Sequence, residues 1–509
     1  MKLPLQLHIF ISLFFLALLT GCVSSDSKND VVVLDVEKRP NIILILADDL
    51  DERLGTIQYM PNLKKYLADQ GVTVEDFLVT TPMCCPSRVN ILRGQYTHNH
   101  QVYNNSAPDG GFAKLYATGE EESTLAVWLQ AAGYRTALIG KYLNAYPNPD
   151  DRTYIPPGWT EWYSPGRKNA YDGYDYYLNE NGTLVPYGPD EENYFTDVMN
   201  RKTTDFIERA AKDETPFFLY ITPFVPHEPA VAARRHEDLL QDIQAPRTPS
   251  FNEVEINDKS PLLQSNPLLT VEDEAKIDEY YRRRVLSMLA VDEMIADLFA
   301  TLETSGELEN TYVIFTSDQG FTLGQHRLLR GKSSLFEEDI VVPFIVRGPG
   351  LPAGVMVKPF LAGSIDIAPT IAEWGGVIPP AFVDGRSFAS ALLSGNVPAG
   401  WRNGFLLRQY TFSGDEDEAS LPGLLSLLDV IQINEPLSYS AGIRTLQYTY
   451  NEHPDGFVEL YDLVQDPYQM ENIASTAAPL LMDGFSKWLS QLKTCKSEKC
   501  RMLESQEVP

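Results

Sequence analysis

The sequence predicts an α/β protein in two parts: a large N-terminal domain built on a mainly parallel mixed sheet flanked by helices, and a smaller C-terminal α+β domain with an antiparallel sheet. Up to about residue 380, strand-like apolar runs alternate with helical patterns, as in proteins with a parallel sheet. Beyond it the helical patterns thin out and short strands such as residues 459–461 appear. The chain of 509 residues also exceeds what one ordinary core supports.

The local pattern predicts each element of the larger domain. Residues 41–47 form a continuous apolar run, typical of a strand buried on both faces. Ser123 and Thr124 are good N-cap residues for a helix that ends before Gly133. Residues 241–273 are rich in Pro, Asn and Ser and predict an excursion over the surface. The other predicted elements are strands over residues 134–139, 216–222 and 312–316 and an amphipathic helix over residues 275–302.

Polar and ionisable residues follow directly after the predicted strands. In open α/β sheets ligands bind outside the carboxyl ends of the strands, so these side chains should converge on one crevice. One such residue would usually be a solvated loop charge, but six with the same placement favour a functional site. They are Asp48, Asp49, Lys141, His227, Asp318 and Gln319.

The overall charge argues against one class of partner. With 41 Lys and Arg against 70 Asp and Glu, the formal net charge is −29. Nucleic-acid binding needs a basic face, so no nucleic-acid partner is expected. A polyanionic substrate is not excluded, because an acidic protein can bind it through a local basic pocket.

An export signal is visible at the N-terminus. Lys2 precedes an apolar run over residues 9–19, the plan of an export signal. The run ends in the letters LTGC, which resemble a bacterial lipobox with Cys22 as its last residue. Signal peptidase would cut before Cys22, and the new N-terminal cysteine would carry lipid. An uncleaved membrane anchor or a plain secretory signal is the alternative.

The expected maturation and the change of pattern near residue 380 divide the chain into four parts. They are a lipoprotein signal peptide (1–21), a polar tether (22–38), the large domain (39–380) and the C-terminal domain (381–509). Several acyl chains anchor a protein stably. We therefore expect an exported bacterial lipoprotein held at the outer membrane, facing the periplasm or the cell surface.

The other four cysteines form two pairs along the sequence. Cys495 and Cys500 flank a short loop near the C-terminus, where export favours a disulfide; two free thiols are the alternative. Cys84 and Cys85 are adjacent, and adjacent cysteines rarely bond each other without strained geometry. The second pair therefore needs another explanation.

Cys84 begins the motif that carries the chemistry. The letters CCPSR at residues 84–88 precede a helical pattern over residues 89–94. Pro86 suits a first helical turn, because its missing N–H costs nothing there. Cys84 would lie at the positive end of this helix, where free N–H groups favour an anion. These residues alone predict a cysteine nucleophile.

Residues 84–88 resemble the Cys-x-Pro-Ser-Arg signature of type I sulfatases, a family of the alkaline phosphatase superfamily. This resemblance implies an alkaline phosphatase-like fold, hydrolysis of sulfate esters, and oxidation of Cys84 to formylglycine by a formylglycine-generating enzyme. Other stretches resemble the glucosamine-6-sulfatase branch, which implies a 6-O-sulfated N-acetylglucosamine or a related sulfated carbohydrate as substrate. They are residues 98–100, 140–144, 245–252, 346–350 and 461–463 and the terminal Cys495, Cys500 and Arg501.

The resemblance also implies how the site works. A hydrated formylglycine carries two hydroxyls: one attacks sulfur, and the other then loses its proton and expels sulfate. A hard divalent cation with oxygen ligands, expected to be one Ca²⁺, would activate the hydroxyl and stabilise negative charge. The metal ligands implied by position are Asp48, Asp49, Asp318, Gln319 and the modified Cys84.

The same resemblance assigns roles to other side chains. Arg88 should hold the hydrate, and Lys141 and Lys332 should bind sulfate oxygens. His227, alone or with Lys332, should protonate the leaving alcohol. For His227 and Lys332 the alternative is an ordinary loop residue. Four more residues are candidates for the substrate pocket, with ordinary structural roles as the alternative: His98, His100, Asn144 and His326.

Two positions depart from the family pattern. Gln319 stands where sulfatases more often have Asn or His, although its amide oxygen can still bind calcium on a longer arm. Leu143 occupies a place where many sulfatases have histidine. Asn144 is an alternative there, and the group that takes the proton from the hydrate is left open.

Three other functions compete with this interpretation. A phosphomonoesterase or phosphodiesterase of the superfamily would prefer a Ser or Thr nucleophile and two metals with more His ligands. A non-catalytic glycan-binding lipoprotein would be expected to lose Asp48, Asp49, Cys84 or Lys332, and all are present. A sulfatase acting on an algal polysaccharide remains open.

Overall fold

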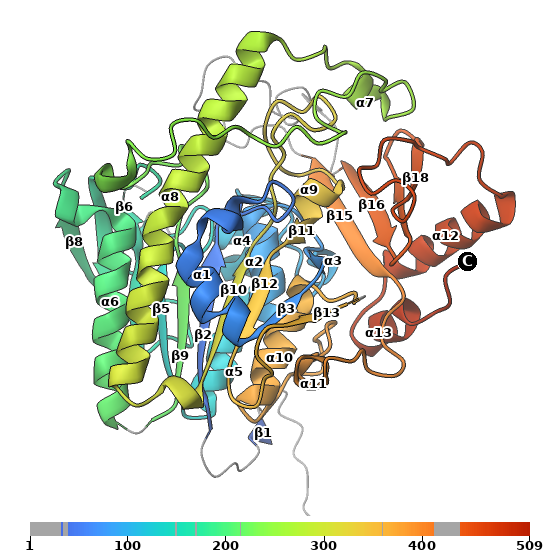
Figure 1. The fold of residues 1–509 in the computed structure, drawn as a ribbon. Helices are drawn as coiled ribbons and strands as arrows, with labels where there is room; N and C mark the ends of the chain where they lie inside the picture. The colour runs from blue at the N-terminus through green and yellow to red at the C-terminus, as the bar shows by residue number, and fades with distance from the viewer. Residues whose placement is uncertain are drawn as a thin grey trace, which may run out of the picture. The chain divides into compact units, whose positions relative to one another are not determined.

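A ten-stranded mixed sheet forms the framework of the larger part of the chain in the computed structural model (Figure 1). β10, β2, β9 and β5 are parallel neighbours at its centre, and they coincide with the four predicted strands. Antiparallel β12, β7 and β8 make the sheet mixed, as predicted. The strand order is β13 (Val355–Val357), β3 (Val72–Val74), β12 (Phe344–Arg347), β10 (Thr311–Ser317), β2 (Asn41–Ala47), β9 (Phe217–Thr222), β5 (Arg135–Gly140), β6 (Glu161–Arg167), β7 (Tyr176–Glu180) and β8 (Thr183–Tyr187).

Helices cover both faces of this sheet because its central strands are apolar on both faces. Along β2, Ile42 and Leu44 face one hydrophobic core while Ile43 and Ile45 face the other, as the two-residue period of a strand requires. The first core includes residues of α2 (Cys84–Arg93), α5 (Leu125–Ala131) and α10 (Ile367–Trp374); the second includes residues of α1 (Pro61–Tyr66), α6 (Phe195–Ala210) and α8 (Val271–Thr304).

The structure describes a defined part of the chain: residues 32–33, 39–147, 150–167, 170–213, 215–358, 360–411 and 438–509. The predicted signal peptide with Cys22, and nearly all of the predicted tether, lie outside these residues and stay predictions. The domain boundary after residue 380 also stays a prediction. Within the described ranges, no helix is long and apolar enough to cross a membrane.

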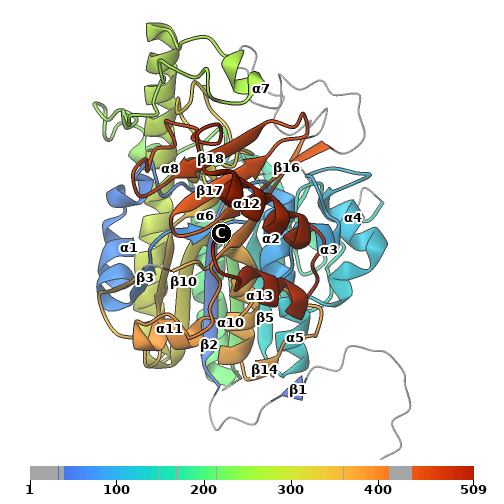
Figure 2. The same ribbon diagram turned by 90° about the vertical axis from the view of Figure 1, so that its right-hand side faces the viewer.

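A separate four-stranded antiparallel sheet lies in the C-terminal part, as predicted, and Figure 2 shows it with α12 toward the viewer. Phe485 of α12 stacks on Tyr450 of this sheet, with ring centroids 5.3 Å apart. The predicted disulfide is present: Cys495, which follows α12, is bonded to Cys500 within α13. The elements are β15 (Phe405–Thr411), β16 (Ser438–Arg444), β17 (Tyr448–Glu452), β18 (Val458–Asp462), α12 (Pro479–Leu492) and α13 (Glu498–Glu504).

The long helix α8 begins at residue 271, four residues before the predicted start at residue 275, because a capping box stabilises its N-terminus. Thr270 Oγ1 accepts a hydrogen bond from Asp273 N at 3.2 Å, and Thr270 N donates to Asp273 Oδ2 at 2.9 Å. Residues 241–270 form the predicted excursion, with α7 (Pro261–Gln264) as a short helix at the top of Figure 1. The remaining elements are β1 (Val32–Val33) paired with β14 (Val377–Ile378), β4 (Phe77–Leu78) paired with β11 (Val341–Val342), α3 (Thr97–His100), α4 (Gly111–Thr118), α9 (Glu337–Ile340) and α11 (Ala389–Ser394).

Candidate active site

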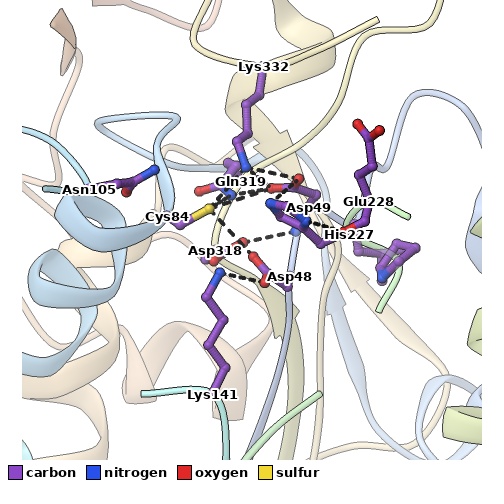
Figure 3. Close-up of polar contacts among 12 residues, drawn as sticks. Asp48, Asp49, Cys84, Asn105, Lys141, His227, Glu228, Asp318, Gln319 and Lys332 are labelled. Carbon is purple, nitrogen blue, oxygen red and sulfur yellow. Dashed lines mark hydrogen bonds and ion pairs between the residues drawn. The ribbon is translucent and has the colours of Figure 1, made fainter. Parts of the chain in front are cut away.

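The polar residues that follow the central strands lie together in the structure (Figure 3). Because β10, β2, β9 and β5 are parallel neighbours, the chain leaves all four strands at the same edge of the sheet. The group at this edge is buried and joined by direct polar contacts. Six of its members follow the strands, as expected from the sequence: Asp48, Asp49, Lys141, His227, Asp318 and Gln319. Cys84 and Arg88 join them from α2, and Lys332 joins them from the loop after β10.

Cys84 lies at the centre of this group, as the first residue of α2. Its Sγ is 3.0 Å from Lys332 Nζ, 3.1 Å from Gln319 Nε2 and 3.5 Å from Asp48 Oδ1. Burial raises the pKa of the thiol well above its ordinary value, although Lys141 and Lys332 oppose this. Since the thiolate is the nucleophilic form, burial disfavours the reactive form of an unmodified Cys84.

Three buried carboxylates in the site each have a close cationic partner, and Asp48 has a second one in Arg88, whose Nη2 is 3.5 Å from Asp48 Oδ1. Formal charges of three carboxylates and three cations cancel, so the site is close to neutral when all six groups are ionised. The pairs are Lys141 Nζ with Asp48 Oδ2 at 2.6 Å, Lys332 Nζ with Asp49 Oδ1 at 2.8 Å, and Arg88 Nε with Asp318 Oδ2 at 2.8 Å.

The carboxylates differ sharply in their pKa values. Burial alone would raise the pKa of Asp48, but Lys141 and the other nearby cations lower it below its usual range. For Asp318, burial raises the pKa to about 7, helped by the charges of Asp48 and Asp49 and opposed by Arg88. Burial, with the charges of Asp48 and Asp49 added to it, therefore makes Asp318 resist ionisation.

The donor atoms fit a hard divalent cation. Gln319 Oε1 is buried and has no hydrogen-bond partner within the described part of the chain, so an acceptor oxygen is available. Ligand atoms of Asp48, Asp49, Cys84 and His227 all lie within 4.8 Å of one another. Positive charge there would also relieve the repulsion that raises the pKa of the third carboxylate. Oxygen donors of this kind suit calcium.

The backbone orients His227. Its Nδ1 lies 2.8 Å from the carbonyl oxygen of Glu228, so Nδ1–H donates and Nε2 faces Asp49, whose Oδ2 is 3.7 Å away. Tyr171 packs against the ring, with centroids 4.6 Å apart. Burial and then the charge of Lys332 lower the pKa of His227. Both effects favour the neutral form of the ring.

Two residues of the site were not singled out from the sequence. Tyr171 lies beneath Lys141, whose Nζ is 5.1 Å from the ring centroid. Arg284 of α8 donates to the carbonyl oxygen of Asp49 at 2.5 Å and to Asp51 Oδ2 at 2.9 Å, which holds the chain as it leaves β2. An arginine on the apolar face of an amphipathic helix was a usable signal for Arg284. Tyr171 lies in an irregular segment that carries no pattern.

Three histidines expected near the substrate are engaged elsewhere. His98 Nε2 is 2.8 Å from the carbonyl oxygen of Cys495. His100 is fully buried with both ring nitrogens bonded, and His326 is fully buried. These contacts give the histidines structural roles, so nothing in the structure supports their expected place in the substrate pocket. Asn144 is buried, and its Oδ1 has no hydrogen-bond partner among the described residues.

His326 belongs to a buried contact that holds the loop carrying Lys332. Its Nδ1 lies 2.7 Å from Glu253 Oε2, while Lys259 Nζ lies 3.1 Å from Glu253 Oε1. His326 and Arg327 adopt positive φ values of 52° and 61°. Residues other than glycine keep such conformations only where surrounding contacts hold them. The excursion between β9 and α8 thus supports the shape of the loop that carries Lys332.

Replacing Glu253 by alanine should lower the free energy of unfolding by about 3 kcal/mol, because it leaves the buried ammonium of Lys259 without this partner. Asp258, 3.1 Å from the same Nζ, keeps the loss at the lower end of the range for broken buried pairs. Urea unfolding measures the change. As a control, Glu272→Ala breaks the exposed pair with Lys276 and should cost less than about 1 kcal/mol. Equal small losses in both variants would contradict a stabilising role for the buried contact among His326, Glu253 and Lys259.

Comparisons with known proteins show the family to which the chain belongs. The family profile described as Sulfatase matches residues 40–377. The N-acetylglucosamine-6-sulfatase of Capra hircus is 34% identical over 480 residues, covering 91% of this chain and 85% of the relative. An arylsulfatase of Volvox carteri is 31% identical over 500 residues, covering 91% of this chain and 76% of the relative.

Solved structures share the fold. A protein solved in complex with its substrate D-glucosamine-2-N,6-O-disulfate superposes with a TM-score of 0.72 at 23% identity, covering 92% of this chain and 99% of that one. A phosphonate monoester hydrolase from Silicibacter pomeroyi superposes with a TM-score of 0.69 at 22% identity, covering 89% and 94%. The predicted alkaline phosphatase-like fold is confirmed. With the family profile and the relatives at over 30% identity, the chain belongs to the sulfatase family and is a sulfuric ester hydrolase.

Proposed function

We propose that the protein removes the 6-O-sulfate from N-acetylglucosamine or a closely related unit of a sulfated glycan. The observation that carries this proposal is the 34% identity, over 91% of the chain, to a protein named N-acetylglucosamine-6-sulfatase. The fold alone does not choose the substrate, because a phosphonate monoester hydrolase shares it. Sequence identity over nearly the whole chain is therefore the stronger guide.

Oxidation of Cys84 to formylglycine is part of this proposal. The thiol is fully buried with a raised pKa, so it is a poor nucleophile as it stands. Its Sγ marks where the oxygens of the hydrated aldehyde would lie. When present, the hydrate would supply one hydroxyl for attack on sulfur and a second whose deprotonation expels sulfate. The motif that directs this oxidation implies a formylglycine-generating enzyme as a maturation partner.

The residues that would hold a calcium ion are Asp48, Asp49, Asp318 and Gln319, together with the modified Cys84. The ion would supply positive charge next to the sulfate oxygens and make the nearby hydroxyl more acidic. Arg88 bridges Asp318 and the carbonyl oxygen of Lys141, which lies 3.1 Å from its Nη1. Arg88 therefore fixes one ligand of the ion relative to a sulfate-binding lysine.

Lys141 and Lys332 are the proposed sulfate-binding residues. Both ammonium groups now pair with Asp48 and Asp49, which are proposed ligands of the cation. A divalent cation on those carboxylates would compensate their charge and leave the two ammonium groups available to sulfate oxygens. Figure 3 shows Lys332 and Lys141 on opposite sides of Cys84, so a sulfate bound there would accept hydrogen bonds from both.

His227 is the proposed acid for the leaving sugar oxygen, with Lys332 beside it. After burial, the charge of Lys332 is the next largest cause that lowers the pKa of His227. A bound sulfate would neutralise that ammonium and add negative charge nearby, and both changes favour the protonated ring. The proton on Nε2 would then pass to the sugar oxygen as its bond to sulfur breaks.

Replacing His227 by alanine should slow hydrolysis of N-acetylglucosamine 6-sulfate by about 100- to 10,000-fold, because a sugar alkoxide is a poor leaving group that needs a proton. The loss should be far smaller with 4-nitrocatechol sulfate, which releases a stabilised phenolate. Steady-state rates on the two substrates measure the difference.

The matched control for His227→Ala is Asp318→Ala, which disturbs the proposed metal site and should slow both substrates alike. Equal losses on both substrates for His227→Ala would contradict its role as the acid. That result would move the role to Lys332. If the wild-type enzyme hydrolysed only the aryl sulfate, the proposed sugar substrate would be wrong.

We also propose that the protein works outside the cytoplasm as a bacterial lipoprotein anchored at Cys22. The apolar run and the lipobox-like ending agree in position, which supports this proposal. An outer-membrane anchor would place the site where large sulfated glycans first meet the cell.

A further inference from the structure

Three guanidinium groups surround one tyrosine beside the proposed active site. Tyr280 lies on α8, and its ring centroid is 5.3 Å from Cζ of Arg283, 5.5 Å from Cζ of Arg330 and 5.9 Å from Cζ of Arg284. The tyrosine side chain is buried, and its hydroxyl has no hydrogen-bond partner within the described chain. Such a concentration of positive charge is unexpected in a chain with a net charge of −29.

The three arginines differ in how their charge is compensated. Arg284 is buried and pairs with Asp51 at 2.9 Å. Arg330 pairs with Glu228 at 2.9 Å. Arg283 forms no ion pair with any described carboxylate, and its buried Nε has no hydrogen-bond partner there. One uncompensated positive charge therefore remains in the cluster.

The cluster adjoins the catalytic groups through two short connections. Arg330 precedes Lys332 by two residues in the same loop, and Lys332 Nζ is 3.0 Å from Cys84 Sγ. Glu228, the partner of Arg330, follows His227 directly and orients its ring through its carbonyl oxygen. An anionic group bound at this cluster would therefore lie on the His227 side of the sulfate being removed.

Solvent and ligands can reach part of the cluster. The side chains of Arg330 and Glu228 are 11% and 25% exposed, and Arg283 is also only partly buried. Partial burial strengthens an interaction between charges while leaving the site accessible. A cation–π contact with Tyr280 explains the position of Arg283. It does not satisfy the Nε of Arg283 or the tyrosine hydroxyl, both of which are hydrogen-bond donors without an acceptor.

We propose that Arg283, Arg330 and the Tyr280 hydroxyl form a subsite for a second anionic group on the same glycan. Guanidinium groups bind carboxylate and sulfate oxygens through paired N–H donors, and the hydroxyl adds a third donor. The group is a carboxylate of a neighbouring uronic acid or an N-sulfate of the same sugar. This inference rests on the proposed sulfated-glycan substrate, and it makes the enzyme selective for units that carry more than one negative charge.

Rates of the full-length enzyme on three 6-O-sulfated substrates test the subsite: N-acetylglucosamine 6-sulfate, glucosamine 2-N,6-O-disulfate and a uronate-linked disaccharide. In Arg283→Met, kcat/KM should fall about 10- to 100-fold on whichever substrate presents the second anion, because a charge-assisted hydrogen bond is lost. It should fall no more than about 2-fold on the monoanionic sugar. A loss on the uronate-linked disaccharide would identify the carboxylate as the ligand, and a loss on glucosamine 2-N,6-O-disulfate would identify the N-sulfate.

Two further variants separate binding from general damage. Arg152→Met removes one exposed arginine outside the cluster and should leave all three rates unchanged. Tyr280→Phe keeps the ring and should show a smaller loss limited to the same two-anion substrate. Equal losses of Arg283→Met on all three substrates, or no loss on any, would overturn the subsite.

Calorimetric binding of the same sugars to Cys84→Ala provides a readout that needs no turnover. Adding Arg283→Met to this variant should weaken binding of the two-anion sugar and leave the monoanionic sugar unaffected. Binding that is equally strong with and without Arg283 would also overturn the subsite. If the wild-type enzyme released no sulfate from any of these sugars, the proposed function would fail separately, whatever the binding result.

Discussion

Replacing Cys84 by alanine should abolish sulfate release while the protein stays folded. The alanine removes the group that would become the nucleophile, and removing a catalytic nucleophile typically costs at least about 1,000-fold in rate. Only one small side chain is lost from a polar cluster, so thermal unfolding should change little. Sulfate release from N-acetylglucosamine 6-sulfate and the unfolding midpoint of the same preparation measure both effects.

Cys85 is the matched control, because it is an equally buried cysteine in the next position. Burial raises the pKa of its thiol to about 12, and its side chain belongs to the hydrophobic core rather than to the polar cluster. Cys85→Ala should keep most of the activity. Peptide mass spectrometry of the wild-type protein should show loss of sulfur at Cys84. An aldehyde at Cys85, or full activity of an unmodified Cys84→Ser, would contradict this assignment.

Removing calcium should be the second large effect. Exhaustive chelation should abolish activity, and added calcium should restore it better than zinc, because the protein donors are carboxylate and amide oxygens. The ion would also compensate the charge of Asp48 and Asp49, which attract Lys141 and Lys332. Sulfate release before and after calcium addition measures the loss and recovery.

A second readout does not depend on turnover. Calcium that binds only the folded state should raise the unfolding midpoint as its concentration increases. Asp49→Asn should weaken this rise, whereas a substitution at the exposed Glu272 should not. The experiment requires protein in which Cys84 is already oxidised, because a thiol next to His227 could favour zinc. Full activity in verified metal-free enzyme would show that no cation is needed.

The centre of the fold was predictable because its signals are local. A strand buried on both faces needs an uninterrupted apolar run, and β2, β5, β9 and β10 contain such runs at residues 42–47, 137–139, 217–221 and 312–315. The polar residues after those strands could then be grouped through a rule about parallel sheets, without any knowledge of distances. The early start of α8 shows what was overlooked, since Thr270 and Asp273 form a capping box visible in the sequence.

For the histidines, the sequence left a substrate-binding role and a structural role open. His98 follows Tyr96 closely in the sequence, but its partner is the backbone of Cys495, almost four hundred positions away. His326 is paired with Glu253 from the excursion. The local sequence around a histidine does not show whether it binds a sugar or stabilises a loop. That distinction depends on contacts with residues far away in the sequence. The cluster around Tyr280 was missed for the same reason, because it joins α8 to the loop after β10.

Residues of the C-terminal part contact the end of the loop that carries Lys332 and the excursion that supports it. These contacts limit where the chain could be cut without loss of structure. Glu337, at the end of that loop, pairs with Arg444 of β16 at 2.8 Å, and its backbone N–H donates to Gln469 at 2.8 Å. Lys259 of the excursion donates to the carbonyl oxygen of Met470 at 2.6 Å. A fragment ending near residue 380 would keep every proposed catalytic residue but lose these supports. The two parts of the chain therefore depend on each other structurally. A chimera that took its C-terminal part from a relative would also need the relative's residues at these contacts.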